Sequence, residues 1–297
     1  MTLPNVQDYH LPGTAEEAIA LLERYGDGAM LVAGGSFVHG LEVRGLLESV
    51  TALIDIQRLD LRTIHHDAAQ VRLGATATFA DLEAAPFVRE DAAFGAVRDA
   101  LTYPPPQIRN VGTVGGCIAA AAPLYDLPAA LLALDAVVCT RSARGTRELP
   151  LGGVFRGLFE NALDPGELIT AVAVPTPAGR TGSAFLKLET NANDLAILSV
   201  AARLSVDDDG VCRTARVVLG GGVGEVYARG SGAEAALVGR RPDAAVFAAA
   251  ADAVAGDFEP VSDHRGSADY RRYMAGIFLR RALATAAERL GLEGATT

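Results

Sequence analysis

Two glycine-rich motifs are the residues of this chain whose types and spacing point most directly to ligand chemistry. The first is Ala33-Gly34-Gly35-Ser36, and the second is the run Ile108-Arg109-Asn110-Val111-Gly112-Thr113-Val114-Gly115-Gly116. Because glycine has no β-carbon, backbone N–H groups in such turns can approach an anion closely, and a nearby hydroxyl adds a donor. Two such turns could hold one diphosphate from opposite sides. Each also has a structural explanation, since glycine pairs are common wherever a strand enters a turn.

Asp126 lies ten residues beyond the second motif. Its carboxylate has two explanations: it is the N-cap of a helix that follows, or it accepts hydrogen bonds from ribose hydroxyls. Neither glycine motif reads G-x-G-x-x-G with an acidic residue at the expected distance, which argues against a Rossmann dinucleotide site.

The spacing of cysteine and histidine argues against a metal site or a nucleophilic active site. Cys117, Cys139 and Cys212 are too far apart to supply the closely spaced thiolates of a zinc or iron–sulfur centre. The groups Asp263-His264-Arg265 and Tyr270-Arg271-Arg272 offer acid–base side chains, but no serine or cysteine nucleophile signature completes a triad. We therefore expect these charged residues to form salt bridges and inter-domain or subunit contacts, and we expect no metal ligand and no catalytic side chain.

The elements that must position the motifs follow from hydrophobic period, glycine and proline. Thr14 and Glu17 form a capping-box pattern before an apolar stripe, which predicts a helix over residues 14–25. The apolar run at residues 29–33 stops at Gly34, as a buried strand entering a tight turn would. Further on we expect strands over residues 53–56, 71–75, 136–140 and 168–174, a helix from residue 79 capped by Thr78, and a helix over residues 127–134. The prolines and glycines of residues 103–116 predict irregular structure around the second motif.

Pro175 and Pro177 mark the expected domain boundary. Beyond them we expect strands over residues 183–188, 196–204 and 215–220, and helices over residues 244–255 and 270–290. The expected class is α+β.

Composition excludes several kinds of partner. The formal net charge is −10 over 297 residues, whereas nucleic-acid binding needs clustered lysine and arginine. No apolar run approaches the roughly 20 residues that span a bilayer. The N-terminus shows no basic segment followed by an apolar stretch, so we expect a cytoplasmic protein with no membrane span.

In their order along the chain, these motifs resemble the FAD-binding (medium) subunits of the xanthine dehydrogenase and carbon monoxide dehydrogenase family of molybdenum hydroxylases. The most specific element is the Ile-Arg-Asn-x-Gly-Thr-x-Gly-Gly run. The resemblance also takes in Ala33-Gly34-Gly35-Ser36, Asp126, Glu167-Leu168-Ile169, Lys187 with Asp194, Gly220-Gly221-Gly222, and the segment from Ser262 to Arg272. It spans nearly the whole chain.

The resemblance implies a fold and a set of cofactor contacts. The implied fold is a two-lobed FAD-binding domain of the PCMH (vanillyl-alcohol-oxidase-like) type at residues 1–176, with subdomains of about 1–57 and 58–176, followed by a C-terminal domain with an antiparallel sheet and helices at residues 181–291. It implies that the FAD diphosphate is cradled by Ala33, Gly34, Gly35, Ser36, Phe37, Val38, His39 and Gly40, and by Thr113, Gly115, Gly116 and Cys117. Asp126 would lie near the adenosine ribose.

Three further positions are implied to lie beside the flavin. Leu168 or Ile169 would contact the isoalloxazine, and Lys187 would approach its polar edge and stabilise negative charge on the reduced ring. Tyr103 would stack on a flavin or adenine face, or else serve as a hydrophobic anchor. Taken alone, a lysine in a strand more often lies on a solvated face.

The sequence departs from the family pattern at several points. Phe37 stands where many relatives have a small polar residue or a carboxylate, Cys117 replaces a common asparagine, and Asn191 or Asn193 stands where an arginine is frequent. These changes put flavin affinity and redox potential in question more than flavin occupancy, because backbone N–H groups carry much of diphosphate recognition. His39 is a conceivable point of covalent flavin attachment, but simple loop packing explains it better.

The family implies a complex in which this chain carries FAD and its partners carry the other cofactors. A large subunit would hold the molybdenum cofactor and a small subunit two [2Fe–2S] clusters, typically as a dimer of heterotrimers. Electrons would pass from the clusters through FAD to NAD, oxygen, a quinone or another acceptor. Two other hypotheses are a stand-alone FAD-dependent oxidoreductase and a flavin-free assembly or scaffold homologue. The organic substrate and the acceptor are not specified by this sequence.

Overall fold

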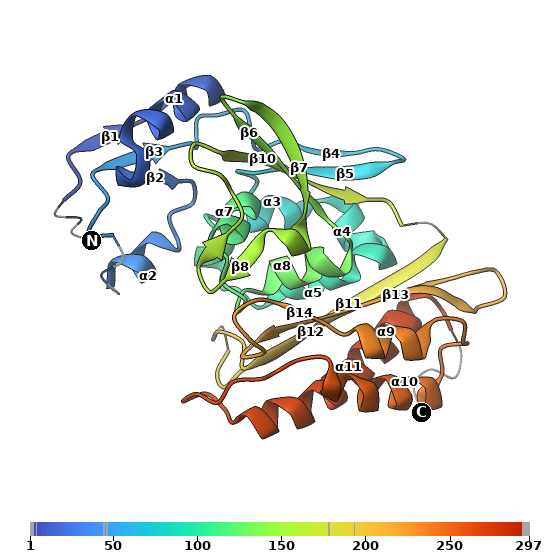
Figure 1. Ribbon diagram of the computed structural model, residues 1–297. Helices are drawn as coiled ribbons and strands as arrows, with labels where there is room; N and C mark the ends of the chain where they lie inside the picture. The colour runs from blue at the N-terminus through green and yellow to red at the C-terminus, as the bar shows by residue number, and fades with distance from the viewer. Residues whose placement is uncertain are drawn as a thin grey trace.

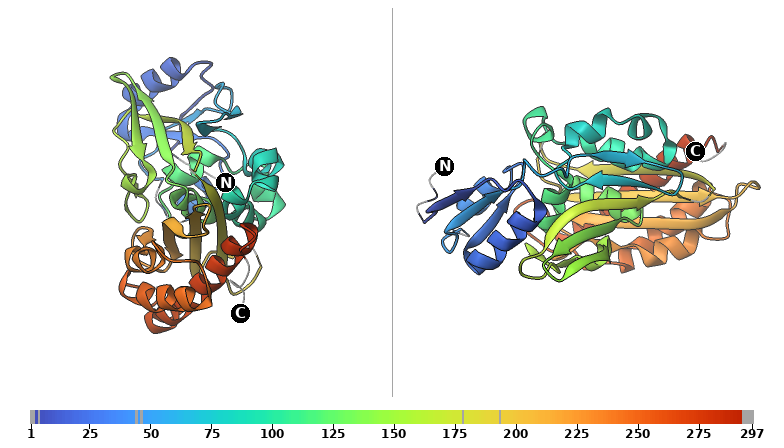
Figure 2. Two further views of the ribbon diagram at one scale, coloured as in Figure 1. Left: turned by 90° about the vertical axis from the view of Figure 1, so that its right-hand side faces the viewer. Right: turned by 90° about the horizontal axis from the view of Figure 1, so that it is seen from above.

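Three layers follow one another along the computed structural model, which describes residues 3, 5–43, 45, 47–177, 179–192 and 194–292, without the side chains of residues 39 and 43. A small N-terminal lobe lies at one end, a larger sheet with helices lies in the middle, and a second sheet with long helices follows (Figures 1 and 2). The expected α+β class is confirmed.

The N-terminal lobe is a parallel three-stranded sheet with strand order β1-β3-β2. Its elements are β1 (Asp8–His10), α1 (Ala15–Tyr25), β2 (Ala29–Val32), α2 (Val38–Val43) and β3 (Ala52–Asp55). The predicted helix at residues 14–25 is confirmed, and the Thr14 side chain accepts a hydrogen bond from the Glu17 N–H at 3.2 Å. The capping box is only half formed, because the Glu17 carboxylate accepts from the N–H of Gly13 instead. The first glycine motif follows β2 directly.

The middle layer is an antiparallel five-stranded sheet with order β4-β5-β10-β6-β7. Its strands are β4 (Ile64–His66), β5 (Gln70–Gly74), β6 (Val137–Ser142), β7 (Gly145–Pro150) and β10 (Leu168–Pro175), and a small pair is formed by β8 (Phe155–Gly157) and β9 (Glu160–Asn161). Its helices are α3 (Phe79–Ala84), α4 (Pro86–Glu90), α5 (Gly95–Thr102), α6 (Pro106–Arg109), α7 (Val114–Ala119) and α8 (Asp126–Ala133). Thr78 caps α3 as predicted, through a complete capping box with Asp81.

The last layer is an antiparallel four-stranded sheet with order β11-β12-β13-β14. Its elements are β11 (Arg180–Leu188), β12 (Leu198–Val206), β13 (Cys212–Gly221), β14 (Ala228–Arg229), α9 (Ser231–Leu237), α10 (Ala244–Ala253) and α11 (Ala268–Arg289). The predicted strands and the two long helices of this region are confirmed within a few residues. At the expected boundary, Pro175 is the last residue of β10 and Pro177 lies between β10 and β11.

The second and third layers share a core. Helices α9, α10 and α11 lie against one face of the β11–β14 sheet, and α5 and α8 lie against the other (Figure 1). Phe185, Ala201 and Val218 of that sheet belong to the same buried cluster as Leu101 of α5 and Ala130 of α8. Helix α8 is apolar almost all round, which is the pattern of a helix buried on every side. The first turn of α8, where Asp126 lies, is therefore buried between the layers.

The structure differs from the sequence-based expectation mainly around the second glycine motif. Residues 103–116 were expected to be irregular, but α6 begins at Pro106 and α7 begins inside the motif itself. Pro106 starts a helix without cost because the first-turn N–H groups have no partner within the helix. Thr113 is the N-cap of α7, and its side chain accepts from the Gly116 N–H at 3.1 Å. No helix in the described part of the chain is long and apolar enough to cross a membrane.

Candidate functional site

The two glycine motifs, about eighty positions apart, touch each other. A β-carbon built on Gly34 would lie 1.6 Å from the carbonyl oxygen of Val111, which is backbone and cannot move aside alone. Gly35 has φ +67°, a conformation that side chains with a β-carbon rarely adopt. Glycine at these two positions therefore lets the turn after β2 lie against the loop that leads into α7.

A cavity of about 480 Å³ lies between these motifs. The residues that the sequence and the resemblance select for cofactor binding line it, with the exception of His39 and Gly40: Ala33, Gly34, Gly35, Ser36, Phe37, Val38, Tyr103, Thr113, Gly115, Gly116, Cys117, Asp126, Leu168, Ile169 and Lys187. Gly40 lies in α2, outside the described lining. The side chain of His39 lies outside the described part of the chain, as does Asn193.

The backbone N–H groups of the two motifs are used differently. In the second motif Val114 and Gly115 donate to the carbonyl oxygens of Ala77 and Ala75 at 2.9 and 2.8 Å, and Gly116 donates to Thr113. In the first, no acceptor for the N–H groups of residues 34–37 lies among the described residues. The N–H groups of residues 114–116 are thus already hydrogen-bonded within the fold, whereas those of residues 34–37 have no such partner in the described part of the chain. The glycines of the second motif serve close packing, since a β-carbon on Gly115 would lie 2.8 Å from that of Ala75.

Asp126 and Lys187 form a buried ion pair at the cavity wall. The Lys187 ammonium lies 3.0 Å from Oδ2 of Asp126 and 3.2 Å from a carboxylate oxygen of Glu189, and the lysine side chain is only 3 % exposed. Asp126 is the first residue of α8, and Tyr125 holds the N-cap position. The N-cap explanation for Asp126 and the solvated-face explanation for Lys187 are therefore both wrong.

One carboxylate oxygen of Asp126, Oδ1, is buried and has no hydrogen-bond partner among the described residues. Burial, only partly offset by Lys187, raises the pKa of Asp126 to about 6. A buried acceptor left without a donor costs free energy, and such groups in folded proteins commonly await a ligand or water.

Tyr103 contacts Lys187, the cationic member of this ion pair, through its ring and its hydroxyl. The Lys187 ammonium lies 4.8 Å from the centre of the Tyr103 ring, within the range of a cation–π contact. The Tyr103 hydroxyl accepts a hydrogen bond from the Lys187 backbone N–H at 3.1 Å, and the ring packs edge-on against Phe185. Tyr103 is thus a hydrophobic anchor that also lines the cavity.

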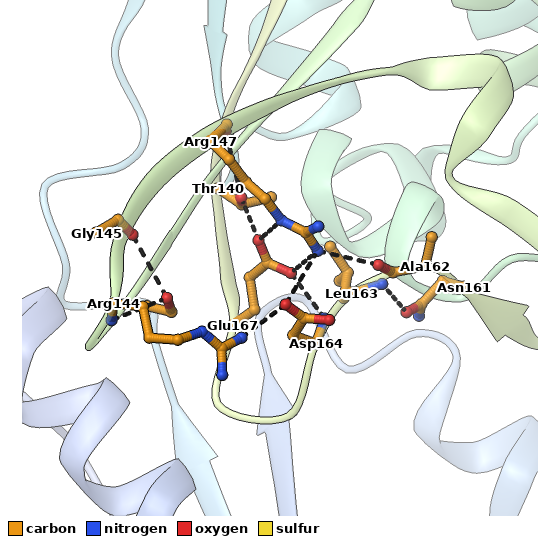
Figure 3. Close-up of polar contacts among 10 residues, drawn as sticks. Thr140, Arg144, Gly145, Arg147, Asn161, Ala162, Leu163, Asp164 and Glu167 are labelled. Atoms are coloured by element: carbon orange, nitrogen blue, oxygen red, sulfur yellow. Dashed lines mark hydrogen bonds and ion pairs between the residues drawn. The ribbon is translucent and has the colours of Figure 1, made fainter.

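Glu167 is a second buried carboxylate at the cavity wall, and all its bonds are made within the fold (Figure 3). Arg147 donates to both its oxygens, with Nε at 2.6 Å from Oε1, the Asp164 N–H donates at 2.7 Å, and the Thr140 hydroxyl donates as well. Burial raises the pKa of Glu167, but these hydrogen bonds outweigh burial and hold it at about 2. The network fixes the start of β10, where Leu168 and Ile169 follow.

Phe37 and Cys117, the two cavity-lining residues that depart from the family pattern, pack as apolar groups. The ring of Phe37 lies 6.0 Å from that of Tyr125 and 5.5 Å from that of Phe159. The Cys117 thiol donates to the carbonyl of Val114, and burial raises its pKa far above the ordinary value. Asn191 is exposed in a turn.

Sequence reasoning missed the role of Glu189 and Phe159. Glu189 follows Lys187 by two positions, the spacing that puts side chains on one face of a strand, so period-2 geometry could have found it. Phe159 lines the cavity with φ +64°, and no local sequence signal predicts that position.

The C-terminal charged group lies outside the described cavity lining. Arg271 pairs with Asp263 at 2.6 Å, which confirms the expected salt bridge. Among the described residues no group of three histidine, cysteine, aspartate or glutamate side chains could hold a metal ion.

Comparison with known proteins gives consistent matches over nearly the whole chain. Residues 4–177 match the FAD binding domain in molybdopterin dehydrogenase, and residues 183–286 match the CO dehydrogenase flavoprotein C-terminal domain. The chain is 34 % identical to the carbon monoxide dehydrogenase medium chain of Hydrogenophaga pseudoflava, with 95 % of this chain and 97 % of that one covered. It is 35 % identical to the alpha subunit of the 6-hydroxypseudooxynicotine dehydrogenase complex of Paenarthrobacter nicotinovorans, with 95 % of each covered. A solved structure of carbon monoxide dehydrogenase from H. pseudoflava superposes with a TM-score of 0.88 at 35 % identity, covering 97 % of this chain and 99 % of that one.

Proposed function

This chain belongs to the FAD-binding medium subunits of the molybdenum hydroxylase and CO dehydrogenase family, and from that membership we propose that it passes electrons from iron–sulfur clusters on a partner, through FAD, to an external acceptor. The observation that carries the proposal is the cavity between the two glycine motifs, in a chain that matches medium subunits from end to end. The acceptor is NAD, oxygen, a quinone or another oxidant.

The residues around the cavity suit FAD in two respects. The N–H groups of residues 34–37 lack acceptors among the described residues, and backbone donors converging in a turn favour an anion such as a diphosphate. The unpartnered Oδ1 of Asp126 is an acceptor for a hydroxyl of the cofactor. We assign the diphosphate to the first glycine motif, with the Thr113 hydroxyl as a donor from the opposite side.

Asp126 and Lys187 act on one part of the cofactor in this proposal. The resemblance assigns Asp126 to the adenosine ribose and Lys187 to the flavin, which lie on opposite sides of the diphosphate in an extended FAD. Since the two side chains are 3.0 Å apart, we assign the pair to the flavin half, with Asp126 accepting from a ribityl hydroxyl. Lys187 then holds a positive charge beside the ring.

Bound flavin supplies redox chemistry in steps of one or two electrons. The chain's own part is to hold the ring against Leu168 and Ile169, to keep water from it and to set the charge near its edge. No side chain needs to act as a general acid or base. We propose the domain division of residues 1–176, with subdomains of about 1–57 and 58–176, and residues 181–291.

We propose that the partners are a large subunit with the molybdenum cofactor and a small subunit with two [2Fe–2S] clusters, assembled as a dimer of heterotrimers. Medium chains and complex subunits among the relatives support a multi-subunit assembly.

Purification of the tagged chain from its native host tests this assignment. We expect two further polypeptides to co-purify, together with flavin, iron and molybdenum in constant ratio, and we expect the organic substrate of the complex to bleach the flavin absorbance. A chain that turns over a small substrate with its own flavin and no partner would indicate a stand-alone oxidoreductase. A colourless chain that FAD cannot reconstitute would indicate a scaffold.

A further inference from the structure

Two arginine side chains from the C-terminal segment donate hydrogen bonds to backbone carbonyls of residues 194–197. Arg265 and Arg271, which we call the arginine clamp, come from the turn before α11 and from its first turns. The segment they hold connects β11 to β12, and two of its residues, Asp194 and Leu195, line the FAD cavity together with Lys187. The two arginines are not among the described lining residues of the cavity; they contact the segment that lines it.

Arg271 is the larger part of the clamp. It is fully buried, its Nε donates to the carbonyl oxygen of Ile197 at 3.0 Å, and its other nitrogens donate to Val261 and, at 2.6 Å, to Oδ1 of Asp263. A β-carbon on Gly222 would lie 2.2 Å from the guanidinium carbon of Arg271, so the absence of a side chain at position 222 leaves room for the guanidinium. A guanidinium whose three nitrogens each donate to a backbone or carboxylate oxygen fixes those atoms strongly.

Arg265 holds the cavity end of the same segment. Its Nη1 donates to the carbonyl oxygen of Leu195 at 2.9 Å and lies 3.6 Å from the Asp194 carboxylate. The Asp263 carboxylate accepts from the backbone N–H of Arg265 at 2.8 Å and from the Arg271 guanidinium, so one aspartate links the two arginines. The Arg265 side chain is 21 % exposed, whereas that of Arg271 is fully buried.

The clamped segment is also tied to the strand that carries Lys187. The N–H of Ile197 donates to the carbonyl of Leu188 at 2.8 Å, directly after Lys187 in β11. A shift of residues 194–197 would therefore displace one cavity wall and the lysine beside it together. Displacements of about 1 Å in a supporting residue are enough to loosen a binding site.

We propose that Arg265 and Arg271 are positioning residues for the flavin: they fix residues 194–197 as the wall of the cavity next to Lys187. The inference rests on the proposed function, because it takes the ligand of the cavity to be FAD. Neither arginine touches the cofactor in this account, and each acts through the carbonyl that it holds.

The test compares R265Q with R272Q in the full-length chain. Arg272 is the matched control, because it adjoins Arg271 in the same helix and carries the same charge. Its ion-pair partners among the described residues are the exposed Glu259 and Asp269. We expect R265Q to weaken FAD binding about tenfold, the loss of one charged hydrogen bond, and R272Q to stay within about twofold of wild type. The flavin midpoint potential and visible circular dichroism should shift in R265Q alone, which a change in overall stability would not cause.

Two further variants keep the test decisive. Arg265→Lys keeps the charge but loses the planar fork, so we expect an affinity between those of wild type and R265Q. Should R265Q fail to fold, Arg265→Lys and Gly222→Ala, which crowds Arg271, provide the same readouts. Wild-type affinity and potential in R265Q or Arg265→Lys would overturn the inference. If the wild-type chain binds no FAD, the proposed function fails instead.

Discussion

The two glycine motifs look alike in sequence and do different work in the structure. The N–H groups of residues 34–37 have no acceptor among the described residues, whereas those of residues 114–116 donate to Ala77, Ala75 and Thr113. In our proposal the first motif offers its N–H groups to the diphosphate, whereas glycine in the second motif lets α7 lie against the end of β5. A glycine-rich turn is therefore evidence for an anion site only when its N–H groups are unpaired.

The same contrast separates the two buried carboxylates of the cavity. Glu167 makes all its hydrogen bonds within the fold, and its pKa is held at about 2. Asp126 has an unpartnered oxygen, and burial raises its pKa to about 6. The first is part of the scaffold, and in our proposal the second is the acceptor that a cofactor hydroxyl satisfies.

The largest expected effect is on the scaffold side, at Glu167. E167Q should lower the free energy of unfolding by about 1–2 kcal/mol, because it removes the buried charge that accepts from Arg147, the Asp164 N–H and the Thr140 hydroxyl. The loss is limited because the Arg147 side chain is 40 % exposed and stays 3.7 Å from the Asp164 carboxylate. Denaturant unfolding of the FAD-free chain measures this, with E148Q as control, since Glu148 is an exposed carboxylate next to Arg147 in β7. Equal stability of the two variants would break the contrast.

At Asp126 we expect the opposite sign. D126N should raise the free energy of unfolding of the FAD-free chain by about 1 kcal/mol at pH 7, since the amide removes a buried charge whose pKa is raised. Lys187 keeps Glu189 as counter-ion. FAD affinity should fall about tenfold, the cost of one hydrogen bond to a charged group. A D126N chain that is less stable yet binds FAD normally would assign Asp126 to the scaffold.

Asp126 and Glu167 should make opposite contributions to the pH dependence of the free energy of unfolding. The folded chain binds more protons than the unfolded chain at Asp126 between pH 3.8 and about 6, so stability falls as pH rises through this window, and D126N should remove that fall. Glu167 has a lowered pKa, so its contribution is present above pH 4.5 and is lost as pH falls toward 2. Unfolding curves between pH 3 and 7 measure both, and parallel curves for wild type and D126N would contradict the assignment.

The smallest effects compare one hydroxyl from each motif. T113A should cost about 1 kcal/mol of stability, because Thr113 caps α7. S36A should change stability by less than about 0.5 kcal/mol, since Ser36 is exposed, yet weaken FAD binding severalfold. Thermal unfolding with and without FAD separates the two, and a reversed order of the stability losses would contradict the contrast.

Much of this arrangement could be predicted from the sequence. The strands on either side of the first motif, the Thr14 and Thr78 caps and the long final helix follow from local pattern, and the resemblance selected Asp126 and Lys187. That these two form an ion pair did not follow, because they come from separate layers that meet only in the fold.

The state of the N–H groups could not be predicted either. The acceptors of Val114 and Gly115, the carbonyls of Ala77 and Ala75, lie about forty positions away in the chain, and the packing of α7 against the end of β5 brings them near. For the same reason the full satisfaction of Glu167 depends on Arg147 and Thr140, which reach it from β7 and β6.

Amide hydrogen exchange with and without FAD tests the central claim most directly. The account predicts that FAD slows exchange at residues 34–37, while residues 114–116 are already protected in the FAD-free chain and change little. Protection that appears on residues 114–116 only when FAD binds, with residues 34–37 unchanged, would contradict it.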